Sequence, residues 1–188
     1  MLVRTALYSA AAIALFAAAA PAGAAVAVLG NSAARQCFQA AESPLMPRPE
    51  TMAICNQAID AEALSRHDLV ATHINRGILL VRRGETEAGL ADFDRAIARD
   101  PTIAEAWFNR GVSLMRTQGP EQALPSFNQA VELSTNRPAL AYFGRGVALE
   151  ALGNVRGAYA DFQRASQLDP EWDRPRVELA RFSVAGGN

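Results

Sequence analysis

A motif that recurs three times along the chain constrains the fold more than any other feature of the sequence. It reads Asn75-Arg76-Gly77, then Asn109-Arg110-Gly111, then Gly144-Arg145-Gly146. The final glycines of the three copies are 34 and 35 residues apart. A period of this length is typical of stacked helical hairpins, in which each unit packs only against its neighbours. The repeat therefore predicts an all-α fold, an α-α superhelix of stacked hairpins.

Each copy of the motif is followed by a small residue, a phenylalanine and an alanine at constant spacing. These residues are Gly89, Phe93 and Ala96, then Ala123, Phe127 and Ala130, then Ala158, Phe162 and Ala165. Small residues let two helices approach closely, and phenylalanine fills the space between hairpins. We expect helices at about 71–83, 86–99, 105–117, 121–134, 139–152 and 155–168. Pro125 predicts a kink or a late start in the fourth of these helices, because proline removes a helical hydrogen bond.

These motifs resemble the tetratricopeptide repeat, whose pattern is a bulky residue, Leu-Gly, a Tyr-like residue, Ala, Phe, Ala and Pro. Three repeats are assigned to residues 70–103, 104–138 and 139–172, about 103 of the 188 residues. The further matching positions are His73, Leu80, Gly84 and Pro101 in the first repeat, Trp107 and Leu114 in the second, and Tyr142, Leu149, Gly153 and Pro170 in the third. The second repeat has one extra residue, and Thr135 stands where proline is usual.

A helical hairpin is predicted before the repeats, within residues 25–69. Its helices are expected at 32–42 and from Pro49 or Glu50 onward, after a short flexible lead at 25–32. One cysteine falls in each helix, Cys37 and Cys55, and an even cysteine count in an exported protein favours a disulfide. Two buried thiols are the alternative. Residues 173–188 are predicted to form a capping helix and a tail, since a repeat array needs a cover for its last apolar face.

The first 24 residues are predicted to be a cleaved signal peptide. Arg4 is the only charge before Arg35, an apolar run covers 6–20, and Ala22-Gly23-Ala24 fits the small-x-small pattern that precedes a cleavage site. Cleavage is expected after Ala24, with Ala25 or Ala27 as alternatives. The sequence has no lysine, which favours a GC-rich bacterial genome. The predicted location is the periplasm; the alternative is an inner-membrane anchor formed by residues 5–29.

The resemblance implies a concave groove lined by the first helix of each repeat. The residues projected into this groove are Ile74, Asn75, Ile78, Arg82, Phe108, Asn109, Val112, Arg116, Phe143 and Val147. The two asparagines could pair with the main chain of an extended ligand, and the two arginines could bind a carboxylate. Some members of the family hold a C-terminal carboxylate with a Lys/Asn clamp, which this lysine-free sequence does not provide. The predicted ligand is an apolar peptide or helix.

Two interpretations of the groove remain open. In the first, the chain is a scaffold of the bacterial cell envelope that binds a protein or peptide partner. In the second, it is a structural or accessory subunit of an obligate complex, whose groove is filled by its own N-terminal hairpin or by a second copy. Membrane association is expected only if the N-terminal segment is uncleaved.

The repeated arginines favour a structural role over a binding role. Each is projected toward the second helix of its own hairpin, where Asp92 and Asp161 recur at matching positions. An ion pair within the hairpin is therefore expected for Arg76 and Arg145. Ser126 replaces the acid in the second repeat, which makes Arg110 the best candidate for a partner-facing arginine.

Composition and motifs argue against other function classes. The net charge of −1 gives no reason to expect nucleic-acid binding, which needs a clustered basic surface. His67 and His73 are the only histidines, and neither stands in a metal-ligand or catalytic motif. No cofactor, no metal, no small-molecule substrate and no enzymatic activity are therefore predicted.

Overall fold

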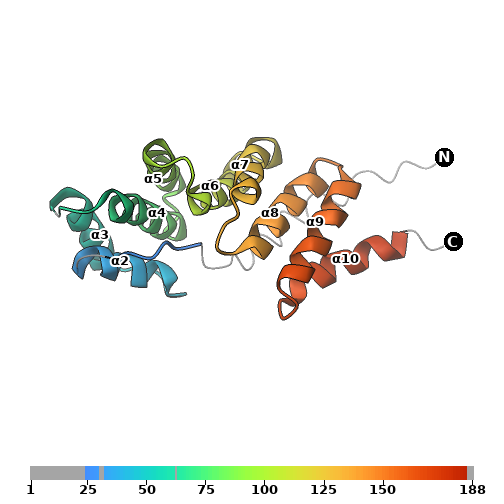
Figure 1. Ribbon diagram of the computed structural model, residues 1–188, viewed down its shortest axis with the longest axis horizontal. Helices are drawn as coiled ribbons and strands as arrows, with labels where there is room; N and C mark the ends of the chain where they lie inside the picture. The colour runs from blue at the N-terminus through green and yellow to red at the C-terminus, as the bar shows by residue number, and fades with distance from the viewer. Residues whose placement is uncertain (1–23, 30–31, 62, 186–188) are drawn as a thin grey trace.

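The computed structural model describes residues 24–29, 32–61 and 63–185, and the regular structure of these residues is entirely helical. An all-α superhelix is thereby confirmed, and the helices succeed one another along its long axis (Figure 1). Their bounds are α2 Ser32–Glu42, α3 Pro49–Ala61, α4 Arg66–Arg82, α5 Thr86–Arg99, α6 Ala104–Thr117, α7 Pro120–Glu132, α8 Pro138–Ala151, α9 Val155–Leu168 and α10 Asp173–Ala185.

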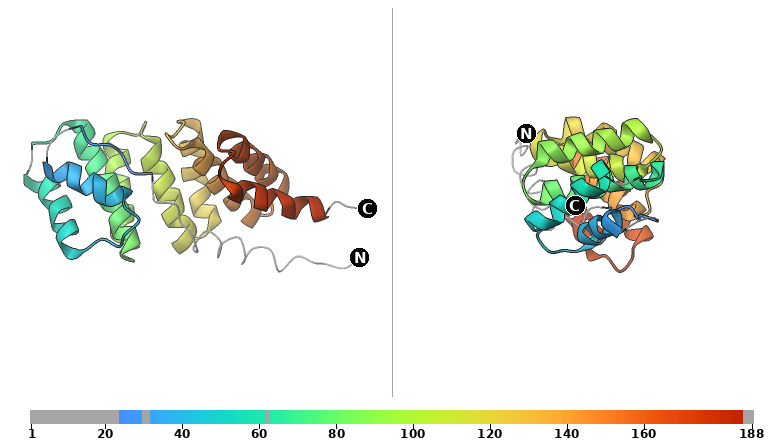
Figure 2. Two further views of the ribbon diagram at one scale, coloured as in Figure 1. Left: turned by 90° about the horizontal axis from the view of Figure 1, so that it is seen from below. Right: turned by 90° about the vertical axis from the view of Figure 1, so that its left-hand side faces the viewer.

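Three helical hairpins form the middle of the molecule. Helix α4 packs on α5, α6 on α7 and α8 on α9, while α5 contacts α6 and α7 contacts α8 to join successive hairpins. Helices α2 and α3 lie at one end of the stack and α10 at the other (Figure 2). The first helices of the hairpins also contact one another, α4 with α6 and α6 with α8. They form the inner layer in which a binding groove was predicted.

The bounds of the repeat helices lie within two residues of the predicted ones, except at the start of α4. Helix α4 begins at Arg66, inside the segment that the sequence assigned to the N-terminal hairpin. Its start is fixed by Ser65, whose hydroxyl accepts a hydrogen bond from the Asp68 N–H at 3.0 Å. Helix α7 begins at Pro120, one residue before the expected bound, and continues past Pro125 to Glu132. Of the two effects predicted for Pro125, a kink or a late start, the late start is therefore wrong. Proline is well suited to this first position, because its missing N–H has no helical partner there.

The repeated glycines are required by the repeated phenylalanines. A Cβ placed on Gly77 would lie 2.6 Å from the Phe93 ring, and one on Gly146 would lie 2.9 Å from the Phe162 ring. Each phenylalanine is fully or almost fully buried. The ring therefore occupies the volume that any side chain at the glycine would need, and the motif encodes one close helix crossing per hairpin.

Gly89 stands at the crossing of α4 and α5 where the other two hairpins carry Ala123 and Ala158. We expect Gly89→Ala to lower the free energy of unfolding by about 1–2 kcal/mol, although alanine favours helix by about 1 kcal/mol. The added Cβ would lie 2.6 Å from Val81 Cγ2 and 2.9 Å from the Gly77 carbonyl oxygen, and that backbone atom cannot turn aside. Urea unfolding followed by circular dichroism measures the change. The control is Ala98→Gly, at an exposed position of the same helix, which reports on helix propensity alone. A gain in stability for Gly89→Ala would contradict the packing argument.

The N-terminal hairpin is tied together and tied to the first repeat. Cys37 in α2 and Cys55 in α3 form a disulfide, and both are fully buried. Helix α2 packs on α4, so its buried face joins the apolar core of the first repeat. A disulfide closing a loop of this size is worth about 3 kcal/mol in the chain-entropy model.

Helix α10 covers the last repeat through aromatic contacts and one ion pair. The Phe182 ring lies 5.9 Å from Tyr159 and 6.0 Å from Phe162, while Arg181 bonds Glu150 of α8 at 2.9 Å. Burial raises the pKa of the Glu150 carboxyl above its ordinary value, against the opposing effect of Arg181. The position of α10 agrees with the predicted capping helix. Within the described part of the chain, no helix is both long enough and apolar enough to cross a membrane.

Candidate peptide-binding groove

Two asparagines one repeat apart define the inner surface of the superhelix. Asn75 lies in α4 and Asn109 in α6, and both are almost fully buried. They are covered by residues 24–29, which we call the strap, the blue segment that passes along α4 toward α6 (Figure 1). The strap has no regular secondary structure, and it precedes α2 in the sequence. The groove of the first two repeats is thus occupied by the chain itself.

Each asparagine pairs with the main chain of one strap residue. The Val26 N–H donates to Asn75 Oδ1 at 2.9 Å, and Asn75 Nδ2 donates to the Val26 carbonyl at 2.8 Å. Ala24 makes the same pair with Asn109, at 3.2 and 3.1 Å. The bonded strap residues are two apart, as expected when one edge of an extended chain faces its partner. A carboxamide that both donates and accepts in this way recognises backbone without reading side chains.

A third anchor holds the end of the strap nearer to α2. The Leu29 N–H donates to Asp68 Oδ1 at 2.9 Å, while the Leu29 side chain is exposed. Burial raises the pKa of Asp68, but this bond and those from His67 and Ser65 outweigh it, so the net pKa is lowered. The carboxylate is therefore charged at neutral pH and accepts the strap's hydrogen bond throughout that range.

The apolar side chains of the strap enter two different clusters. Ala25, Val26 and Val28 pack in the core of the first repeat, which includes Ile74 and Ile78. Ala24 instead joins the core of the second and third repeats. This second cluster contains Phe108, Phe143 and Val147. The strap thereby bridges two cores, with the boundary between Ala24 and Ala25.

Of the two interpretations of the groove, the structure of the first two repeats corresponds to the one in which the chain itself covers the predicted apolar floor. Ile74 and Ile78 lie beneath the strap and α2 in the first core. Phe108 packs 6.2 Å from the Phe127 ring, and Phe143 packs 4.9 Å from Trp172, so both belong to the internal packing. Of the remaining predicted groove residues, Val147 is buried, Val112 is half-buried and Arg116 is exposed.

Arg82 does not face a ligand carboxylate. Its guanidinium donates to the main-chain carbonyls of Ala40, Ala41 and Ser43, at and just beyond the C-terminal end of α2. These carbonyls have no partner within the helix, and a cation at this end also interacts favourably with the helix dipole. Burial lowers the pKa of Arg82. The residue holds α2 against α4 and is not available to bind a ligand.

Two of the three repeated arginines form ion pairs within their own hairpins, as predicted. Arg76 bonds Asp92 through two nitrogens at 2.7 and 2.8 Å, and Arg145 bonds Asp161 at 2.7 and 2.9 Å. In each pair the hydrogen bond that the arginine donates to the carboxylate raises the pKa of the arginine, against the effect of burial. These arginines stabilise the crossing of the two helices.

The prediction that Arg110 is free to face a partner is wrong. Arg110 bonds Asp94 of the preceding hairpin at 2.8 Å and donates to the Ser126 hydroxyl at 2.8 Å. The acid that is missing from its own hairpin is thus replaced by one from the neighbouring repeat. Sequence comparison of equivalent positions could not find this partner, since Asp94 lies two residues beyond the repeating position.

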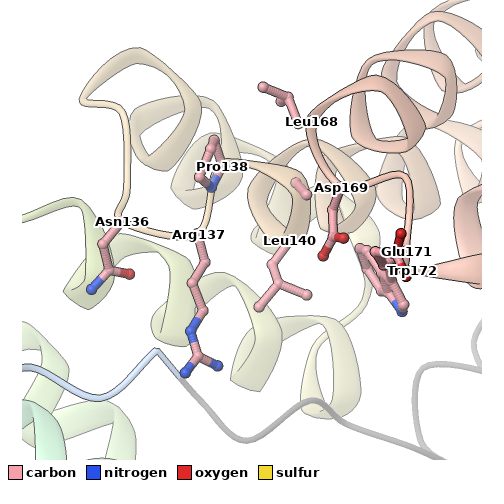
Figure 3. A pocket seen from close by; sticks show the side chains of 9 residues that line it. Asn136, Arg137, Pro138, Leu140, Leu168, Asp169, Glu171 and Trp172 are labelled. Carbon is pink, nitrogen blue, oxygen red and sulfur yellow. The ribbon is translucent and has the colours of Figure 1, made fainter.

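A pocket of about 630 Å³ lies at the third repeat, between the turn before α8 and the turn before α10. Figure 3 shows the Arg137 and Leu140 side chains on one side of it and Asp169 and Trp172 on the other. Its lining therefore mixes apolar and charged groups. Sequence reasoning did not propose a site here. The signal was the extra residue of the second repeat, which lengthens the turn before α8.

The sequence does not predict the strap, since residues 25–32 are expected to form a short flexible lead. The apolar run Ala24-Ala25-Val26-Ala27-Val28 was the available signal. The predicted signal peptide lies almost wholly at 1–23, outside the described residues. No group of three or more potential metal ligands occurs among the residues for which the structure gives positions.

Comparison with known proteins agrees with this architecture. Models of the tetratricopeptide repeat match residues 74–138 and 139–172. Among solved structures, the second repeat domain of human RPAP3, in complex with the HSP70 peptide SGPTIEEVD, is 26% identical over 63% of this chain and 98% of that one, with a TM-score of 0.58. MamA from Desulfovibrio magneticus is 21% identical over 81% of this chain and 80% of that one, with a TM-score of 0.62.

Curated relatives carry the same repeat in longer chains. Tetratricopeptide repeat protein 28 of Mus musculus is 30% identical over 69% of this chain and 5% of its own length. Tetratricopeptide repeat protein 36 of Xenopus tropicalis is 33% identical over 55% of this chain and 52% of its own. The chain thus spans about half or less of these two relatives. Because the two repeat models together match more than half of its residues, the chain belongs to the tetratricopeptide repeat family.

Proposed function

We propose that this chain is a non-catalytic interaction module of the bacterial cell envelope, which binds an extended segment of a partner protein along the inner faces of α4, α6 and α8. The observation that carries the proposal is the strap. An extended segment already lies on this surface, with its main chain paired to Asn75 and Asn109. Such pairing supplies affinity for any extended chain, and the apolar surroundings select small, uncharged side chains.

The similar structures are consistent with this proposal. The RPAP3 domains were solved with HSP90 and HSP70 peptides, so the fold can hold peptides. The ligand class differs here, because the sequence has no lysine and the strap that occupies the groove is uncharged. Export to the periplasm is part of the proposal and rests on the predicted signal peptide.

A second candidate is favoured by the same observation. Residues 24–29 fill the inner surface of the first repeat, as expected for an accessory subunit whose groove is self-occupied. In that case the partner would bind an outer face of the stack. The two candidates place the partner on different helices, and this difference can be measured.

Photo-cross-linking in cells distinguishes them. A photoreactive residue at Arg116, which is exposed and lies seven residues after Asn109 on the same face of α6, reports on the groove. The same probe at Gln163, exposed on α9, reports on the outer layer. We expect a partner cross-link from position 116 that the change Asn109→Leu abolishes. A cross-link from position 163 alone would reject the groove and favour the accessory subunit.

A further inference from the structure

We propose that α10 is a pH-sensitive cap, which stays docked on the last repeat in mildly acidic solution and is released as the pH rises, because two buried carboxylates at the contact share one arginine. The carboxylates belong to Glu150 of α8 and Glu178 of α10, and the arginine is Arg181 of α10. This contact lies at the end of the stack away from α2, and the inference does not depend on the proposed function.

Arg181 bridges the two carboxylates. Its Nη2 donates to Glu150 Oε1 at 2.9 Å, and its Nη1 donates to Glu178 Oε2. The Glu150 and Glu178 side chains are 9% and 7% exposed, whereas the Arg181 side chain is 31% exposed. When both carboxylates are ionised, two negative charges face one positive charge, so one negative charge is left unbalanced in a largely dry contact.

The unbalanced charge belongs to Glu150. Its Oε2 atom is buried and accepts no hydrogen bond in the described part of the structure. An ionised carboxylate oxygen without a donor is costly to bury, and protonation lowers this cost. Burial raises the pKa of the Glu150 carboxyl, Arg181 opposes this effect and Glu178 adds to it, and the net pKa is raised. Docking of α10 and ionisation of Glu150 therefore disfavour each other.

The charged groups that shift the Glu150 carboxyl are Arg181 and Glu178, both of α10. The neighbouring helices carry their charges in other contacts or in solvent. They contribute an ion pair between α8 and α9, exposed arginines of α6 and α9, and one arginine a turn before Glu178 in α10: Arg145 with Asp161; Arg116, Arg156 and Arg164; and Arg174.

The position of α10 allows it to move without the rest of the stack. It contacts the last hairpin through the Phe182 ring, which lies 5.9 Å from Tyr159 and 6.0 Å from Phe162, and through the bond from Arg181 to Glu150. A terminal unit of a repeat stack is held from one side, so it opens at a lower cost in free energy than the units between two neighbours. Release of α10 uncovers the aromatic face of the third repeat.

The direction of the switch follows from proton linkage. The pKa of Glu150 in the docked state lies above its ordinary value of 4.5, which applies once the side chain returns to water. The docked form thus binds the proton more strongly than the released form. The contribution of Glu150 to docking is fully present below about pH 4.5 and is lost as the pH rises through the raised pKa.

Hydrogen exchange of the full chain between pH 4.5 and pH 8 tests the proposal. The exchange rate of each α10 amide, divided by its intrinsic rate at the same pH, gives the opening constant of the helix. We expect this constant to rise with pH, about tenfold for each unit by which the pKa of Glu150 is raised. It should also exceed the opening constant of α9 at every pH. A constant that does not rise, or one equal to that of α9 throughout, would overturn the proposal.

Three variants assign the effect to the shared arginine. Glu150→Gln keeps an acceptor for Arg181 but carries no charge, so its opening constant should be independent of pH. Glu171→Gln removes an exposed acid just before α10 and should keep the rise of the wild type. Arg181→Gln leaves both carboxylates without their cation and should extend the rise to higher pH. A rise that persists in Glu150→Gln would assign the titration to another group and overturn the proposal.

Discussion

Replacing Asp92 with alanine is expected to lower the free energy of unfolding by about 3–5 kcal/mol and the melting temperature by about 10 °C. Asp92 is fully buried in α5. Its carboxylate accepts two hydrogen bonds from Arg76, lies 3.1 Å from His73 Nδ1 and accepts a third bond from Arg95 at 3.0 Å. The alanine variant leaves the largely buried guanidinium of Arg76 without its anion, and an uncompensated buried charge is strongly destabilising.

The matched control for this variant is Asp94→Ala. Asp94 is largely exposed, pairs with Arg110 and lies two residues away in the same helix. An exposed ion pair contributes about 0–1 kcal/mol, so the control should change the melting temperature by only a few degrees. Thermal unfolding followed by circular dichroism compares the two variants. Equal shifts would show that burial adds nothing to the Asp92 pair.

The same carboxylate predicts how stability depends on acid. Burial raises the pKa of Asp92, but the hydrogen bonds from Arg76 and His73 outweigh it and lower the pKa to about 2, below the ordinary value of 3.8. A lowered pKa contributes stability that is fully present above the ordinary value and is lost as the pH falls through the folded one. The wild type should therefore lose stability between about pH 4 and pH 2. Asp92→Asn should show a shallower loss over the same window.

The repeat explains why most of the fold was predictable. Helix positions, the glycine–phenylalanine crossings and the Arg76 and Arg145 ion pairs all follow from equivalence between repeats, because residues at matching positions meet matching neighbours. The extension of α4 to Arg66 was not predictable in this way. It depends on Ser65, which lies before the first repeat and caps the helix by a local hydrogen bond.

The groove shows where equivalence between repeats no longer helps. The sequence indicated that Asn75 and Asn109 could pair with an extended main chain, and the structure shows that they do so with the strap. The sequence alone could not show that the strap is the segment bound to these asparagines, because the contacts join residues 49 and 85 positions apart. Arg82 illustrates the same limit, since the carbonyls it binds belong to a helix outside the repeats.

Replacing Phe127 with alanine is expected to lower the free energy of unfolding by about 3–5 kcal/mol, the cost of truncating a buried aromatic ring and leaving a cavity. Phe127 is fully buried. Its ring would lie 2.9 Å from a Cβ on Gly111 of its own hairpin and 2.7 Å from a Cβ on Gly144 of the next. One side chain thus fills the contact between α6, α7 and α8.

Hydrogen exchange measures where this loss acts. In a stack of repeats, stability is the sum of the individual units and the interfaces between neighbours, so damage to one interface should loosen the units beside it most. We expect amides of α8 and α9 to exchange much faster in Phe127→Ala, with a smaller change in α4 and α5, which the disulfide-linked hairpin supports from the other end. The control is Tyr159→Ala, at a 43% exposed site on α9. Uniformly faster exchange in Phe127→Ala would show that the superhelix unfolds as one unit. The strap joins the two apolar cores across α4 and α6, and it would then be the contact that couples the two cores.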